Sequence, residues 1–226
     1  MITRAALAAC IDHTLLRPEA TPTEVESVCE EGAALGVAAV CVSPTMVPLV
    51  ASFPTRAFAV CAVIGFPSGA HVSGVKAAEA NWAEMEGATE LDMVIDLGRA
   101  KSHDWAGVAA DVAEVRAAVT GTLKVILESA ALSSRELHEV AGAALDGGAD
   151  YLKTSTGFHP AGGATLEAVA ALAELAAGAG RPVGVKASGG IRDARTALDM
   201  LAAGATRLGC SATGAILDGL ADLPQL

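Results

Sequence analysis

The sequence predicts a single (β/α)₈ barrel, an α/β fold in which eight parallel strands alternate with helices. Short apolar runs alternate with longer segments of helical periodicity along the 226 residues. No linker, low-complexity tail or block of like charges divides the chain, so we expect one domain over residues 1–226. Hydrophobic residues make up 52% of the chain, which is enough to bury a substantial core at this length.

Eight apolar runs have the length and composition of buried strands. They are Ile11–Leu16, Ala38–Val42, Ala57–Ile64, Glu90–Asp96, Leu123–Glu128, Asp150–Thr154, Pro182–Ala187 and Arg207–Cys210. Strands that alternate with helices indicate a parallel sheet, and a closed barrel is the simplest closure at this length. The alternative is an open doubly wound sheet. Arg17-Pro18-Glu19 follows the first run where such a fold often has a glycine-rich dinucleotide-binding turn, which favours the barrel.

Helix start and stop signals lie between these runs. Thr21-Pro22-Thr23-Glu24 and Ser133-Ser134-Arg135-Glu136 each read as a capping box at the start of a helix. A stripe of apolar residues at steps of three and four predicts another helix. Its members are Trp105, Val108, Val112, Val115 and Val119. Helix ends are expected at four glycines, Gly36, Gly87, Gly147 and Gly204.

Composition excludes several classes of function. A net charge of −11 argues against nucleic acid or an anionic membrane as a partner. No apolar run reaches the roughly 18 to 20 residues of a spanning helix, and the N-terminus does not resemble a signal peptide, so we expect a cytoplasmic protein. The five cysteines are widely spaced without a CxxC pair, and the five histidines are scattered. We therefore expect no disulfide framework, no metal site and no cofactor.

Charged side chains interrupt three of the predicted strands. Their apolar neighbours should face the helices, so Asp92, Lys153 and Lys186 should point into the barrel. The same parity holds for three further polar residues, Asp12, Thr14 and Lys124. Charged groups inside a barrel are costly to desolvate unless they are paired, and catalytic residues of barrel enzymes lie at the C-terminal strand ends. Since each of the three lies toward that end of its run, a catalytic set and a structural ion-pair layer on the barrel floor both remain open.

Two lysines and a carboxylate are the minimum parts of a Schiff-base aldolase. An amine attacks a carbonyl only when it is unprotonated, and a pKa of about 10.4 leaves roughly one lysine in a few thousand neutral at pH 7. Burial and a neighbouring ammonium group both lower a lysine pKa, and a value near about 7 would make the amine reactive. We expect Lys186 to supply that charge to Lys153, and Asp92 to move protons between the covalent intermediates.

Glycine-rich turns follow the seventh and eighth predicted strands. Gly189-Gly190 leads from one strand into a helix, and Gly209 and Ser211 follow the other. Turns at these places form the recurring phosphate site of barrels, because glycine lets backbone N–H groups approach an anion. Gly189-Gly190 alone would indicate only a tight turn, but its coincidence with Ser211 favours phosphate. Gly157 is a weaker candidate, more typical of loop geometry.

Seven segments resemble the deoxyribose-phosphate aldolases over about residues 10 to 215. They are Ile11-Asp12-His13-Thr14-Leu15-Leu16, Val40-Cys41-Val42, Val63-Ile64-Gly65-Phe66-Pro67, Glu90-Leu91-Asp92-Met93-Val94-Ile95, Lys153-Thr154-Ser155-Thr156-Gly157-Phe158, Val185-Lys186-Ala187-Ser188-Gly189-Gly190-Ile191-Arg192 and Ala205-Thr206-Arg207-Leu208-Gly209. The segments that begin at Lys153 and at Lys186 are together highly specific for this family.

The resemblance implies a cofactor-free class I aldolase. In it Lys153 resembles the Schiff-base lysine, and Asp92 and Lys186 resemble the proton-transfer pair. The implied reaction is the reversible cleavage of 2-deoxy-D-ribose 5-phosphate to D-glyceraldehyde 3-phosphate and acetaldehyde, in deoxynucleoside catabolism. Thr14 and Cys41 match positions that the family places near the substrate, although core packing accounts for both from the sequence alone. Family enzymes are often dimers, which implies a homodimer or higher homo-oligomer.

The sequence departs from the family pattern in two places. Ala212 stands where a second serine is common, which predicts weaker phosphate binding unless Thr213 substitutes for it. His159-Pro160 is unusual for the loop after Phe158.

Two other functions remain open. One is another Schiff-base barrel, such as a transaldolase-like enzyme or an aldolase for a different phosphosugar. The other is a barrel without activity that binds a phosphosugar as a sensor. A sensor has no need of a reactive amine, so the two lysines and the aspartate count against it.

Overall fold

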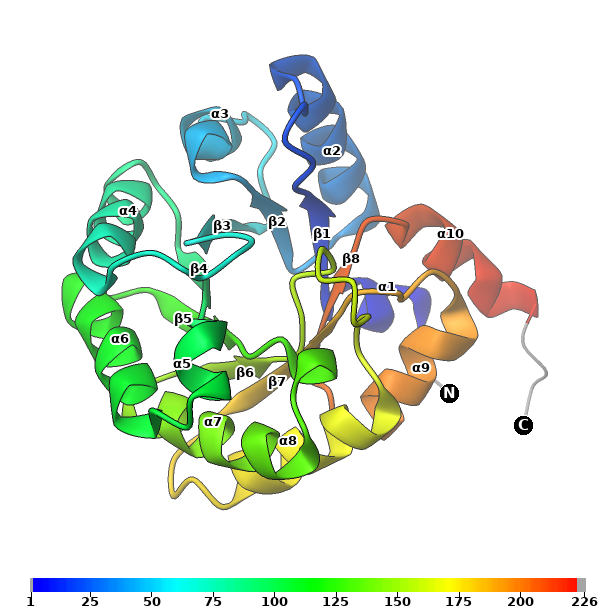
Figure 1. Ribbon diagram of the computed structural model, residues 1–226. Helices are drawn as coiled ribbons and strands as arrows, with labels where there is room; N and C mark the ends of the chain where they lie inside the picture. The colour runs from blue at the N-terminus through cyan, green and yellow to red at the C-terminus, as the bar shows by residue number, and fades with distance from the viewer. Residues whose placement is uncertain (1, 223–226) are drawn as a thin grey trace.

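The computed structural model describes residues 2–222, in which eight parallel strands close into a barrel in chain order. The predicted fold class is confirmed, and Figure 1 shows the helices as a ring around the strands. The strands are β1 (Ile11–Leu15), β2 (Ala39–Val42), β3 (Ala59–Ile64), β4 (Glu90–Val94), β5 (Thr122–Ile126), β6 (Tyr151–Lys153), β7 (Gly184–Ser188) and β8 (Arg207–Cys210). Residue 1 and residues 223–226 of the predicted domain lie outside the described part.

The outer layer consists of helices of very different lengths. The α-helices are α1 (Arg4–Ala8), α2 (Pro22–Leu35), α3 (Val47–Ala51), α4 (Ser73–Met85), α5 (Leu97–Lys101), α6 (Trp105–Ala118), α7 (Ser134–Asp146), α8 (Leu166–Ala177), α9 (Ala194–Ala202) and α10 (Thr213–Asp218). Short 3₁₀ helices are η1 (Pro44–Met46), η2 (Ser129–Ala131) and η3 (Gly219–Asp222). No helix among residues 2–222 is both long and apolar enough to cross a bilayer.

Local sequence signals explain where several helices begin and end. Both predicted capping boxes form, with Thr21 paired to Glu24 at the start of α2 and Ser133 paired to Glu136 at the start of α7. Each box satisfies backbone N–H groups that have no partner within the helix. Helix α2 ends at Gly36, whose φ of 71° lies in the left-handed region that glycine adopts without strain.

The predicted boundaries are wrong by one or two residues at most strand ends. Asp96, predicted as the last residue of the fourth strand, instead caps α5 by accepting hydrogen bonds from two backbone N–H groups. Val119, predicted on the apolar stripe of a helix, is extended and follows α6, which ends at Ala118. Periodicity continues past the last ladder hydrogen bond, so it does not reveal where the backbone turns.

The barrel separates two apolar layers. Outward-facing strand residues pack against the helices in the main hydrophobic core. A smaller cluster lies inside the barrel and consists of residues from β2 and β3 and the residue after β1: Leu16, Ala39, Cys41, Cys61 and Val63. Most of the remaining inner positions, in β1 and in β4 to β8, carry polar or charged side chains. All five cysteines are free, and four of them are buried.

Candidate active site

Asp92 is the centre of a charged cluster inside the barrel. Its Oδ2 atom accepts hydrogen bonds from Lys153 Nζ at 2.6 Å and from Lys186 Nζ at 2.7 Å, and its Oδ1 atom accepts one from Lys124 Nζ at 2.8 Å. These residues come from β4, β6, β7 and β5. Alternation along each strand points all four side chains to the axis, as predicted. The two amines predicted to act together therefore converge on one carboxylate oxygen.

The cluster extends downward to the N-terminal ends of the strands. Asp12 accepts hydrogen bonds from Lys186 and from Arg207, the latter at 2.7 Å. Arg207 also pairs with Glu90 at 3.3 Å and lies over the ring of Tyr151. These three residues begin β8, β4 and β6, so they close the barrel floor. The barrel thus has an ion-pair layer at its floor, and Asp92 with the two predicted catalytic lysines lies above that layer.

Charge within the cluster fixes the protonation of its buried members. Burial alone would raise the pKa of Asp92, but the ammonium groups of Lys124, Lys153 and Lys186 hold it well below its usual range. Burial alone would lower the pKa of Lys186, but the carboxylates of Asp12 and Asp92 outweigh it and raise that pKa. Asp92 is therefore an anion and Lys186 a cation at neutral pH.

The three predicted catalytic residues lie at different depths, which corrects the expectation that each is near a C-terminal strand end. Lys153 is the last residue of β6, whereas Asp92 and Lys186 are the third of five residues in β4 and β7. Lys153 is 3% exposed, and the other two are fully buried. The next inward position of β7 is Ser188, which lies one step nearer the C-terminal strand end than Lys186.

A cavity of about 400 Å³ opens above the cluster at the C-terminal ends of the strands. Among residues 2–222, Lys153 is the only lysine that lines it. Six of the residues predicted to bind substrate or phosphate also line it: Thr14, Gly157, Gly189, Gly190, Gly209 and Ser211. The cavity is the place where barrel enzymes hold their substrates, and it gives the Lys153 amine a route to a ligand.

The turn after β7 has the features of an anion site. Gly189 and Gly190 have φ values of 88° and 85°, a backbone that other residues rarely adopt. Among the hydrogen bonds of residues 2–222, none is donated by the backbone N–H of Gly189, Gly190 or Ile191. Free N–H groups at a cavity wall, with the Ser211 hydroxyl from the next loop, suit a phosphate oxygen.

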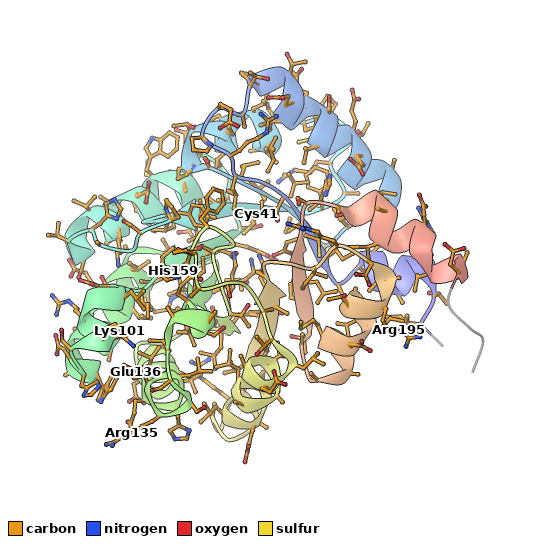
Figure 2. All side chains as sticks on the ribbon, turned by 45° about the vertical axis from the view of Figure 1, so that its right-hand side comes forward. Cys41, Lys101, Arg135, Glu136, His159 and Arg195 are labelled. Atoms are coloured by element: carbon orange, nitrogen blue, oxygen red, sulfur yellow. The ribbon has the colours of Figure 1, made fainter. Side chains whose placement is uncertain are left out.

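Packing explains the residue type at two of the predicted binding positions, Gly209 and Cys41. A Cβ atom on Gly209 would lie 2.4 Å from Ser188 Oγ and 3.2 Å from Lys186 Cε, so glycine makes room for both neighbours. Cys41 is fully buried in the small apolar cluster and does not line the cavity. Figure 2 shows it among the strands at the middle of the barrel. The structure therefore does not bring Cys41 to the cavity surface.

The structure shows that Thr213 does not take the place of the serine that is common at the position of Ala212. Thr213 is fully buried, and its Oγ1 atom is 2.8 Å from His13 Nδ1, so it faces away from the cavity and does not replace the missing serine. Ala212 itself makes no side-chain cap for α10.

His159 and Pro160 lie outside the main cavity. They line a neighbouring cavity of about 160 Å³, on the loop where Figure 2 labels His159. This second departure therefore lies apart from the predicted phosphate turns.

Two groups of residues in the cluster have metal-ligand chemistry, although no metal was expected. They are Cys41 with Cys61 and Asp92, and Asp12 with Cys61 and Glu90. In each group the carboxylates already accept hydrogen bonds or ion pairs from lysine or arginine. A cation at either place would lie against those ammonium groups and be repelled. The expectation of metal-independent chemistry remains a prediction.

Sequence reasoning missed several residues of the site. Arg207 has the inward parity of Gly209, two residues later, and that alternation could have revealed it. Arg17 and Arg192 line the cavity rim, and nothing in their local pattern distinguishes them from surface arginines. Glu128, a buried carboxylate that lines the smaller cavity, has a left-handed backbone (φ 56°) that no sequence pattern predicted.

A closed (β/α)₈ barrel, with a lysine at the base of a cavity on its C-terminal face, defines an enzyme of the barrel class. The chain belongs to the DeoC/LacD family of aldolases, whose profile matches residues 6–221. It is thus a carbon–carbon lyase, and the resemblance drawn from its motifs is confirmed.

Relatives of the same kind cover nearly the whole chain. A deoxyribose-phosphate aldolase of Mycolicibacterium paratuberculosis is 58% identical over 96% of this chain and 98% of its own length. One from Nocardia farcinica is 53% identical over 96% of each chain. The solved deoxyribose-phosphate aldolase of Aeropyrum pernix, described as having a unique tetrameric structure, is 34% identical with a TM-score of 0.89 over 98% and 94% of the two chains.

Proposed function

We propose that this aldolase cleaves 2-deoxy-D-ribose 5-phosphate reversibly to D-glyceraldehyde 3-phosphate and acetaldehyde through a Schiff base on Lys153. The observation that carries the proposal is the position of Lys153, which lines the cavity and donates a hydrogen bond to Asp92 beneath it. The relatives named deoxyribose-phosphate aldolase support the choice of substrate. The free cysteines support the expected cytoplasmic location, and the catabolic role belongs to the proposal through the family resemblance.

Basic groups outnumber carboxylates in the buried cluster. The cluster holds four basic groups (Lys124, Lys153, Lys186 and Arg207) and three carboxylates (Asp12, Glu90 and Asp92). One positive charge is in excess, so the carboxylates do not balance every basic group of the buried cluster. Lys153 is the member at the cavity surface, where its amine can meet an aldehyde.

The covalent steps follow from that arrangement. Neutral Lys153 Nζ attacks the C1 aldehyde carbon, and the resulting carbinolamine loses its hydroxyl as water to give an imine. A base removes the proton of the C3 hydroxyl, the C2–C3 bond breaks, and the electron pair moves into an enamine as D-glyceraldehyde 3-phosphate leaves. Protonation at C2 and hydrolysis then release acetaldehyde and restore the amine. Asp92 carries protons to and from the nitrogen, and Lys186 remains an ammonium group that favours the neutral amine.

Reductive trapping tests the Schiff base. Incubation with acetaldehyde and borohydride is expected to place one ethyl group on Lys153, in EDTA as in its absence, because reduction of the imine is irreversible. Peptide mass mapping locates the label. Recovery of the label mainly on Lys186 would overturn the assignment of roles, and strong inhibition by EDTA would point to a metal-dependent reaction.

The phosphate turns should decide specificity for the phosphorylated sugar. Replacing Ser211 with alanine removes one donor, so the KM for 2-deoxy-D-ribose 5-phosphate should rise about 10-fold. Turnover of unphosphorylated deoxyribose should be slow and unaffected by the change. Ser27→Ala, which removes an exposed hydroxyl on α2, is the matched control. Equal rates of the wild-type enzyme on the two sugars would mean that these turns bind no phosphate.

We also propose that the chain forms a homo-oligomer. The Aeropyrum pernix relative is described as tetrameric. Helix α4 carries three large exposed apolar side chains, Val75, Trp82 and Met85, which supports burial of this helix in an assembly. Light scattering of the purified chain measures the mass, and a monomer would contradict the proposal.

A further inference from the structure

Glu128 is a buried carboxylate that the proposed chemistry does not use. It follows β5, is 3% exposed, and lines the smaller of the two cavities. No ion pair joins it to a basic group of residues 2–222, although every other carboxylate buried in the barrel interior has one. A buried carboxylate needs hydrogen-bond donors in place of a cation.

Thr156 supplies those donors. Its hydroxyl donates to Glu128 Oε2 at 2.6 Å, and its backbone N–H lies 3.3 Å and 3.4 Å from the two carboxylate oxygens. Thr156 is three residues beyond Lys153 and lines both cavities. Glu128 therefore ties the loop after β6 to the end of β5, beside the amine.

The backbone around Glu128 is built to turn its side chain toward that loop. Its φ of 56° and ψ of 53° are left-handed, a conformation disfavoured for a residue with a Cβ atom. Flanking hydrogen bonds hold it there: Leu127 N–H donates to Lys153 O at 2.9 Å, and Ser129 N–H donates to Thr154 O at 2.8 Å. The two segments are thus joined on both sides of the carboxylate.

The contact also fixes the direction of the Thr156 hydroxyl. A threonine hydroxyl has one hydrogen and two lone pairs. The hydrogen is donated to Glu128, and one lone pair accepts from Phe158 N–H at 3.0 Å. The remaining lone pair can only accept, so the oxygen presents an acceptor to a hydroxyl group in the cavity.

We propose that Glu128 is a positioning residue that acts through Thr156, holding its hydroxyl as a hydrogen-bond acceptor for a hydroxyl group of the sugar substrate. This inference rests on the proposed function, because only the proposed sugar substrate has hydroxyl groups that Thr156 could bind. Acetaldehyde, the other proposed reactant, has none. Loss of Glu128 therefore impairs the reaction of the sugar and leaves imine formation from acetaldehyde intact.

A double-mutant cycle tests the pair. In Glu128→Gln an NH₂ donor replaces one acceptor oxygen and faces the donors of Thr156, so kcat/KM for 2-deoxy-D-ribose 5-phosphate should fall about 10- to 100-fold. Thr156→Val should lose at least as much, and the double variant should be no worse than Thr156→Val alone. Borohydride trapping of acetaldehyde at Lys153 should be unchanged in all three. Glu174→Gln, an exposed substitution on α8, is the matched control.

Each outcome is decisive. A further loss from Glu128→Gln in the Thr156→Val background, or full activity of Glu128→Gln, would overturn the positioning role. If Glu128→Gln fails to fold, Glu128→Gly replaces it, since glycine adopts the left-handed backbone freely and only the carboxylate is lost. A wild-type enzyme that traps acetaldehyde but does not cleave the sugar phosphate would instead overturn the proposed substrate.

Discussion

Replacing Lys153 with methionine is expected to lower turnover of 2-deoxy-D-ribose 5-phosphate by about 10⁴-fold or more while the barrel stays folded. Methionine fills a similar volume at this 3% exposed position but has no amine to attack the aldehyde. The substitution also removes the excess positive charge of the cluster, leaving three basic groups and three carboxylates. Stability should therefore be unchanged or slightly higher.

A coupled assay for D-glyceraldehyde 3-phosphate measures the loss, and thermal unfolding followed by circular dichroism measures stability. Lys101→Met is the matched control, because Lys101 lies on the outer surface beside Glu136, as Figure 2 shows, and its exposed ion pair contributes little. More than about 1% residual activity in Lys153→Met would contradict a covalent mechanism, since noncovalent binding alone gives far smaller rate enhancements.

Replacing Asp92 with asparagine should reduce both activity and stability. Asparagine keeps the shape but leaves four basic groups beside only two carboxylates in a buried site. Breaking a buried ion pair on one side costs about 3–5 kcal/mol of the free energy of unfolding. Loss of the proton carrier should lower kcat by about 10²- to 10⁴-fold. Urea unfolding and steady-state kinetics measure the two effects.

Acid titration gives an independent check of the Asp92 prediction. Its pKa is depressed in the folded protein, so its contribution to stability is fully present above the unfolded pKa of about 3.9 and is lost as the pH falls below that value. The difference in unfolding free energy between wild type and Asp92→Asn should thus be constant above about pH 5 and shrink below about pH 4. Asp146→Asn, an exposed substitution at the end of α7, is the control. A difference that is small at pH 7 would mean that the cluster does not depend on this carboxylate.

Local periodicity made the fold and the inward-facing charges predictable. Each strand alternates with a period of two, so the parity of Asp92, Lys153 and Lys186 could be read from their apolar neighbours without knowing the fold in three dimensions. The motifs around Lys153 and Lys186 were specific enough to identify the family. The capping boxes at Thr21 and Ser133 located two helix starts. They were predictable because the two partners of each box are only three residues apart in the sequence.

Depth within the barrel could not be predicted in this way. The height of an inward residue depends on the stagger between neighbouring strands, which is set when the barrel closes. The register places Asp92 opposite Lys124 and Lys153 opposite Lys186, and only that pairing lets three lysines reach one carboxylate. Parity alone could not distinguish Lys153, at the cavity surface, from Lys186 beneath Ser188.

The sequence by itself determined an eight-fold strand–helix alternation, the side of each strand that faces the axis, and membership of an aldolase family. Only the tertiary structure decided that Lys153 is the one lysine of the described residues that lines the cavity, that Thr213 contacts His13, and that Glu128 accepts hydrogen bonds from Thr156. The physical reason is the distance along the chain. Periodicity and capping depend on residues two to four apart, whereas these contacts join residues 28 to 200 positions apart through the closure of the barrel and the left-handed turn at Glu128.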